Sequence, residues 1–104
     1  MPFPRAGLLG SMTSTNPEGL WRHLVGEQLR DIRQGRGESL RTVAGRARVS
    51  PQYLSEIERG FKEPSSEILA ALGESLDTSL LDLTVGVAER LTTNASRGEF
   101  RLAA

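Results

Sequence analysis

The basic side chains between residues 20 and 62 are the groups in this sequence with the clearest chemical capacity. This segment contains nine lysine or arginine residues and five acidic residues, an excess of four positive charges. Residues 63–104 contain seven acidic residues and three arginines, an excess of four negative charges. This asymmetry indicates an anionic partner for the first half of the chain. A solvated mixture of surface charges would give the same totals, so charge alone leaves both interpretations open.

Residues suited to catalysis or metal binding are scarce. His23 is the only histidine, and the 104 residues include no cysteine. Disulfides and thiolate metal sites are therefore excluded, and a reducing, cytoplasmic location is expected. No glycine-rich phosphate loop follows a strand pattern, and no nucleophile has a plausible base. We predict that the chain is not an enzyme and needs no cofactor or metal, with His23 on the surface.

The spacing of apolar residues predicts an all-α fold of five helices in one compact domain. Apolar side chains recur every three or four residues, and no strand pattern or membrane-length apolar run is present. The expected helices are 20–35, 40–48, 51–59, 66–76 and 80–92. Residues 1–19 are rich in Gly, Pro, Ser and Thr, which predicts a disordered N-terminal arm. Residues 93–104 are expected to form a flexible tail, leaving a domain at 20–92.

The segment RVSPQYLSEIERG, residues 48–60, has clear helix-boundary signals. Ser50 is a favourable N-cap, Pro51 suits the first helical position, and Gly60 suits a left-handed helix end. The preceding helix, which begins after Ser39, is also only about eight residues long. Two short helices joined by a tight link are typical of a helix-turn-helix, whose second helix enters the DNA major groove. An ordinary helical bundle remains the alternative on spacing alone.

Residues 25–83 resemble the phage Cro and repressor type of helix-turn-helix domain, the XRE family. The most specific motifs are YLSEIERG, followed by a short loop with Pro64, and LRDIR. Within that family, SLRTVAGRARVS and YLSEIERGFKEPSSEIL are similar to the bacterial (actinobacterial) clp gene regulators. The narrower resemblance implies activation of protease genes during stress.

The family resemblance implies a buried ion pair between the first helix and the recognition helix, which maps onto Arg33 and Glu58. Arginine has a rigid fork that fits a carboxylate. This sequence departs from the family at the start of the second helix, where Leu40 replaces a common glutamine and Glu38 replaces an apolar residue. The phosphate contact of that glutamine is therefore in doubt, and Arg41 is a candidate replacement.

The resemblance also implies that the third helix, at about 51–59, reads bases in the major groove. The expected base-reading residues are Ser50, Pro51, Gln52, Tyr53, Ser55 and Glu56. Glutamine pairs well with adenine, and a carboxylate accepts from the cytosine amino group. Basic residues around this helix are expected to bind phosphates and to position the domain. They are Arg36, Arg41, Arg46, Arg48, Arg59 and Lys62.

A homodimer is expected because one domain reads only a few base pairs and two-fold dimers bind paired half-sites. The last helix has two apolar stripes, and a helix packed on one side needs only one. The second stripe must pack on the start of the first helix or on a second subunit, and we expect a dimer interface that includes Trp21, Leu81, Val85 and Ala88. A last helix buried fully in its own monomer is the alternative.

Two further expectations concern partners. The C-terminal sequence Leu102-Ala103-Ala104 resembles the end of a bacterial degradation tag and suggests recognition by a Clp-type protease. A protein-interaction module, such as an antitoxin, is the alternative to a regulator that binds a DNA operator. Antitoxins usually have a long segment that wraps the toxin, whereas only about twelve residues follow the expected last helix.

Overall fold

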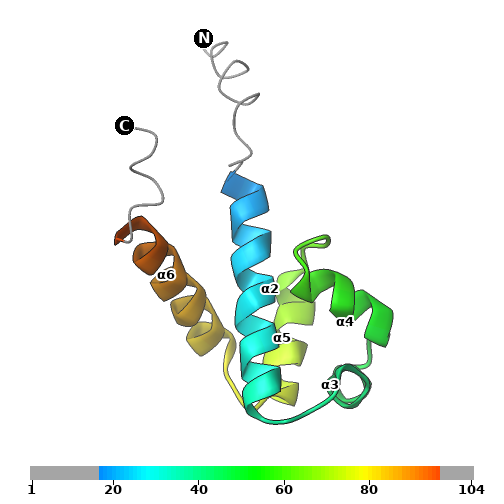
Figure 1. Cartoon of the computed structure of the whole chain (residues 1–104). Helices are drawn as coiled ribbons and strands as arrows, with labels where there is room; N and C mark the ends of the chain where they lie inside the picture. The colour runs from blue at the N-terminus through cyan, green and yellow to red at the C-terminus, as the bar shows by residue number, and fades with distance from the viewer. Residues whose placement is uncertain (1–16, 97–104) are drawn as a thin grey trace.

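A computed structural model describes residues 17–96, which form five α-helices and no strand. The helices are α2 Pro17–Gly35, α3 Leu40–Ala47, α4 Pro51–Glu58, α5 Ser66–Ser75 and α6 Leu80–Ser96. In Figure 1, α2 and α6 lie side by side and antiparallel, while α3 and α4 lie on the opposite side of α2. α5 packs against α3 and α6. The expected all-α, five-helix fold is confirmed.

Two helices are longer than their sequence patterns predict. α2 begins at Pro17 instead of Leu20, and α6 continues to Ser96 instead of ending near Thr92. Proline lacks a backbone N–H, which the first turn of a helix does not need. In α6, Thr92 Oγ1 donates to the carbonyl oxygen of Ala88 at 3.1 Å, and the helix continues to Ser96. Residues 1–16 and 97–104 lie outside the described part of the chain, as do most of the expected arm and tail.

Four serines cap helix N-termini. The hydroxyls of Ser39, Ser50, Ser65 and Ser79 each accept from the backbone N–H three residues later, at 2.9–3.1 Å. Each serine thus satisfies one of the donors that a helix start leaves unpaired. Gly60 follows α4 with φ +81°, the left-handed conformation expected there.

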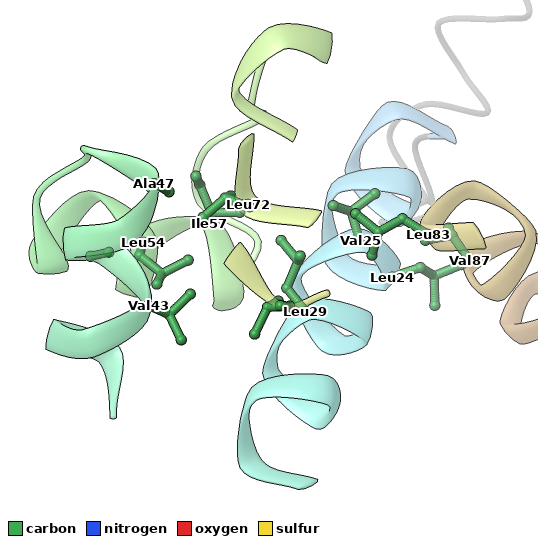
Figure 2. Close-up of a cluster of buried hydrophobic side chains, with 12 residues drawn as sticks. Leu24, Val25, Leu29, Val43, Ala47, Leu54, Ile57, Leu72, Leu83 and Val87 are labelled. Carbon is green, nitrogen blue, oxygen red and sulfur yellow. The ribbon is translucent and has the colours of Figure 1, made fainter. Parts of the chain in front are cut away.

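The core joins all five helices. Val43 of α3 and Leu54 and Ile57 of α4 are almost fully buried, as are Leu29 of α2 and Leu72 of α5. On the other side of α2, Figure 2 shows Leu24 and Val25 beside Leu83 and Val87 of α6. α2 therefore contributes apolar side chains to both halves of the core, and it fixes α4 and α6 relative to each other.

Gly26 sets how closely α2 and α4 approach. A Cβ atom at this position would overlap the backbone carbonyl oxygens of Ile57 and Glu58. Backbone atoms cannot rotate away as a side chain can, so the two helices would have to separate. The absence of a side chain at Gly26 therefore allows the end of α4 to lie directly on α2.

We predict that Gly26→Ala lowers the free energy of unfolding by about 1–3 kcal/mol, the usual cost of overpacking. The matched control is Gly45→Ala on α3, where an added Cβ meets nothing within 4 Å. That variant should be neutral or stabilising by up to about 1 kcal/mol, because alanine favours helix. Urea denaturation of both proteins tests the prediction. Equal stability of the two variants would contradict it.

Candidate nucleic-acid interface

The exposed face of α4 has the polar residues that the sequence analysis selected for base reading. Pro51 and Gln52 are exposed, and Ser55 and Glu56 are partly exposed. Within residues 17–96, neither Gln52 nor Glu56 has a side-chain hydrogen bond or ion pair. Their donors and acceptors are therefore available to a ligand.

Ser50 and Tyr53 differ from the other expected base-reading residues. The Ser50 hydroxyl accepts from the backbone N–H of Tyr53 at 3.0 Å, so it is engaged in capping α4. The Tyr53 side chain is partly buried and packs against the core. Gln52, Ser55 and Glu56, together with Arg59 one turn after Ser55, form a continuous stripe along the helix, which we call the α4 stripe.

Four of the six basic residues expected at the phosphates lie exposed around α4. They are Arg41, Arg48, Arg59 and Lys62. Arg48 ends α3 in the left-handed conformation, with φ 63°, directly before the link to α4. The Arg59 guanidinium lies over the Phe61 ring, 4.8 Å from its centre. None of the four side chains has an ion pair within residues 17–96.

Arg36 and Arg46 have intramolecular partners instead. Both bind the Glu38 carboxylate, Arg36 through Nε at 3.0 Å and Arg46 through Nη2 at 2.6 Å. Arg46 Nη1 also donates to the carbonyl oxygen of Ser75 at 2.8 Å, and Arg36 contacts Asp77 at 3.2 Å. We call Arg36, Glu38, Arg46 and Asp77 the Glu38 cluster. It joins the end of α2 to α3 and to the α5–α6 turn.

The Glu38 cluster changes the interpretation of two sequence features. Glu38 stands where the family resemblance implies an apolar residue, and its two arginines bring polar partners to that position. The same ion pairs occupy Arg36 and Arg46, whose expected contact with phosphates stays a prediction. The cluster could not be predicted from the sequence, because Arg46 and Asp77 reach Glu38 and Arg36 only after folding.

The ion pair implied for Arg33 and Glu58 is present. Arg33 Nε donates to Glu58 Oε2 at 2.8 Å, and Nη2 donates to Oε1 at 3.0 Å. The side chains are only 12% and 5% exposed. A hydrogen bond to Glu58 is the main cause that raises the pKa of Arg33 above its ordinary value. Arg33 Nη1 also donates to the carbonyl oxygen of Glu38 at 2.9 Å, so one guanidinium holds both α4 and the α2–α3 link.

Leu40 of α3 and Arg30 of α2 lie beside the Arg33–Glu58 ion pair. Leu40, in the position that the resemblance gives to glutamine, is partly buried against the core. Arg30, which was not in the expected phosphate-binding set, is exposed and lines a cavity with Leu40 and Arg59. The regular helical pattern of α2 gave no signal for this position.

The expected dimer residues fall on two separate surfaces. Leu81 is 70% exposed and Val85 46% exposed, and Ala88 is exposed on the same face of α6. We call these three residues the α6 stripe. Trp21 is partly buried and lines a different, apolar pocket of about 270 Å³ with Leu20, Leu24 and Leu91. The structure therefore groups Leu81, Val85 and Ala88 but does not bring Trp21 to them.

Residues 17–96 contain no group of three or more His, Asp or Glu residues placed to hold a metal ion. Within the same residues, no helix has the length and apolar character needed to cross a membrane. His23 is exposed, as expected, and its Nε2 lies 3.0 Å from Glu27.

Known proteins with similar sequences contain a helix-turn-helix domain, in agreement with the arrangement of α3 and α4. Residues 24–84 match the family model described as "Helix-turn-helix domain". A stretch of 72 residues, 69% of the chain, is 49% identical to transcriptional regulator ClgR of Mycobacterium tuberculosis. That stretch covers 64% of the mycobacterial protein, slightly less than two thirds of its length.

Solved structures of regulatory proteins are also similar to this chain. The crystal structure of the clp gene regulator ClgR from Corynebacterium glutamicum matches with a TM-score of 0.73 and 38% identity. The match covers 80% of this chain and 88% of that one. The restriction-modification controller protein C.AhdI from Aeromonas hydrophila matches with a TM-score of 0.58 and 27% identity, over 60% of this chain and 94% of that one. These relatives are regulators, in agreement with the expectation that the chain is not an enzyme.

The Glu38 cluster predicts a specific pH dependence of stability. Hydrogen bonds from Arg46 and then Arg36 lower the pKa of Glu38 from 4.5 to about 2. A carboxyl group with a lowered pKa stabilises the fold fully above its ordinary pKa and loses this effect as the pH falls toward the folded-state value. The stabilisation should therefore be complete at pH 7 and disappear between about pH 4.5 and pH 2.

We expect Glu38→Gln to unfold at a lower urea concentration than the unmodified chain at pH 7. The difference between the two unfolding midpoints should shrink steadily as the pH falls from about 4.5 to about 2. Glu63→Gln is the matched control, since Glu63 is exposed and has no ion pair within residues 17–96. Urea titrations at several pH values test this. A difference for Glu38→Gln that stays constant from pH 7 to pH 2.5 would show that the carboxylate charge is not responsible.

Proposed function

Because this chain belongs to the helix-turn-helix domain family of the XRE, phage Cro and repressor type, we propose that it is a sequence-specific DNA-binding transcriptional regulator. The observation that carries the proposal is the α4 stripe, a row of polar side chains with no side-chain hydrogen bond or ion pair within the described residues, on a helix whose opposite face is buried. Arg33 and Glu58 fix this helix against α2, and unpaired basic residues surround it. A rigid polar helix inside a basic rim is complementary to base edges between two phosphate backbones.

In this proposal α4 enters the major groove and Gln52 and Glu56 supply most of the sequence discrimination. Gln52 can donate to and accept from adenine at once, and Glu56 can accept from the amino group of cytosine. Ser55 lies between them and adds a smaller polar group. Tyr53 contributes less, because its side chain is partly buried against the core.

Arg41, Arg48, Arg59 and Lys62 would bind phosphates and fix the register of α4 along the duplex. Arg36 and Arg46 are left out of this set, because the Glu38 cluster already neutralises their charges. Phosphate contacts add affinity for any sequence and make it sensitive to salt. Base contacts and phosphate contacts should therefore be separable by experiment.

We further propose that the α6 stripe forms the contact between two copies of the chain. Leu81 and Val85 are large apolar side chains that remain exposed although their neighbours Leu83 and Val87 are buried. Isologous pairing of the same stripe in two copies would cover both and give the two-fold symmetry of paired half-sites. Trp21 is not needed for this contact.

The likeness to the clp gene regulators supports a proposal about the target genes. We propose that they include genes for Clp-type proteases, expressed under stress. The C-terminal Leu102-Ala103-Ala104, which lies outside the described residues, remains a proposed recognition signal for such a protease.

The base-reading proposal predicts that Gln52→Ala loses sequence preference but keeps its dependence on salt. Losing a two-hydrogen-bond contact with one base should remove about 1–3 kcal/mol of discrimination at that position. Fluorescence anisotropy against a pool of genomic DNA fragments, at two salt concentrations, measures both properties. The matched control is Gln34→Ala, which removes an exposed glutamine of α2. Equal, weak binding of the unmodified chain to every fragment would instead favour a protein partner, as in an antitoxin.

The dimer proposal predicts that Leu81→Asp converts a dimer to a monomer, because a buried charge without a partner is strongly unfavourable. Sedimentation equilibrium over a range of protein concentrations measures the change. Phe61→Asp is the control, since Phe61 is an equally exposed apolar residue outside α6, at 65%. An unmodified chain that is monomeric at all concentrations, or a Leu81→Asp protein that still dimerises, would exclude this interface.

A further inference from the structure

A cavity of about 190 Å³ opens beside the C-terminal end of α4. The ends of α2 and α4 and the start of α3 form its walls, through residues that include Arg30, Leu40 and Arg59. Ser55 also lines it, so the cavity adjoins the α4 stripe. A water molecule occupies about 30 Å³ of liquid volume, so the space admits a phosphate group together with some water.

The charge of this cavity is positive. Its only acidic group is Glu58, and both oxygens of that carboxylate already accept from Arg33. Arg30 and Arg59 have no ion pair within the described residues. Two arginine residues without a carboxylate partner in the described residues therefore line the cavity. Their repulsion would be relieved by an anion bound between them.

The position of the cavity indicates which anion it would receive. Gln52, Ser55 and Arg59 follow each other at three- and four-residue spacing along one face of α4. When Gln52 faces a base edge, the Arg59 end of the same face lies further along the helix, toward the cavity and Arg30. The DNA group available at the edge of the groove is a backbone phosphate, and guanidinium groups bind phosphate through paired hydrogen bonds.

We propose that Arg30 and Arg59 together hold one phosphate of the DNA backbone in this cavity. The inference rests on the proposed function and adds Arg30, a residue of α2, to the DNA-binding surface. The shared phosphate would link α2 directly to the DNA, beside the ion pair that links α2 to α4. It would thereby fix the angle at which α4 enters the groove.

The test is the salt dependence of binding, measured by fluorescence anisotropy on a DNA fragment that the unmodified full chain binds tightly. Arg30→Gln should weaken binding about tenfold, the value of one hydrogen-bonded charge, without changing sequence preference. Because one phosphate is shared, the double variant Arg30→Gln, Arg59→Gln should lower the slope of log Kd against log salt concentration by about 0.9. Two separate phosphates would lower it by about 1.8.

Controls separate this inference from general effects of charge and folding. Arg22→Gln removes the same charge from α2 at a residue that contacts the carbonyl oxygen of Gly60, and neither its affinity nor its slope should change. Arg30→Lys keeps the charge and should recover most of the lost affinity, which a purely structural role of Arg30 would not predict. Thermal unfolding of each variant confirms that it is folded.

Three results would overturn the proposal. If the unmodified chain binds DNA selectively and Arg30→Gln behaves like Arg22→Gln, the shared phosphate is wrong and the proposed function stands. If the unmodified chain binds no DNA, both are wrong. If inorganic phosphate at constant ionic strength saturably shifts the Arg30 Nε–H signal in NMR spectra while Arg30→Gln binds the DNA as tightly as the unmodified chain, the cavity serves a soluble phosphate compound instead.

Discussion

The ion pair between Arg33 and Glu58 is the interaction on which the arrangement of the domain depends. α3 and α4 have only eight residues each, too few to be stable helices in isolation. Arg33 binds both oxygens of Glu58 and also the carbonyl oxygen of Glu38, so one side chain of α2 fixes both short helices. A buried pair is weak evidence for stability in general, but losing one partner leaves an uncompensated charge. Here its geometry specifies where α4 lies.

The arginines of the neutral chain divide into two groups by their partners. Arg33, Arg36, Arg46 and Arg90 bind carboxylates within the domain, and Arg90 joins α6 to α2 through Asp31 at 2.5 Å. The other described arginines, Arg22, Arg30, Arg41, Arg48 and Arg59, have no carboxylate partner in the described residues. A net charge of zero is therefore compatible with a positive surface, because many acidic groups are used to neutralise the arginines that hold the helices together.

The close approach of α2 and α4 depends on Gly26, on the same two helices that the Arg33–Glu58 ion pair joins. Gly26 lets the carbonyl groups at the end of α4 lie against α2, and Leu29 and Ile57 are fully buried nearby. The packing brings Arg33 and Glu58 within hydrogen-bonding distance, and the ion pair in turn fixes the rotation of α4. The exposed face of α4 then carries Gln52, Ser55 and Glu56, while Leu54 and Ile57 point into the core.

The sequence by itself determined the features that depend on near neighbours in the chain. Serine caps, Pro51, Gly60 and the apolar spacing predicted five helices and the starts of the last four, whereas the pairing of Glu58 with Arg33 was implied only by the resemblance to the XRE family. Only the tertiary structure decided which arginines remain unpaired. Arg36 and Arg46 meet Glu38 and the α5–α6 turn, and Arg30 reaches the cavity beside Arg59, through folding. Helix periodicity repeats locally, whereas ion pairs and cavities depend on distances between segments that the sequence does not state.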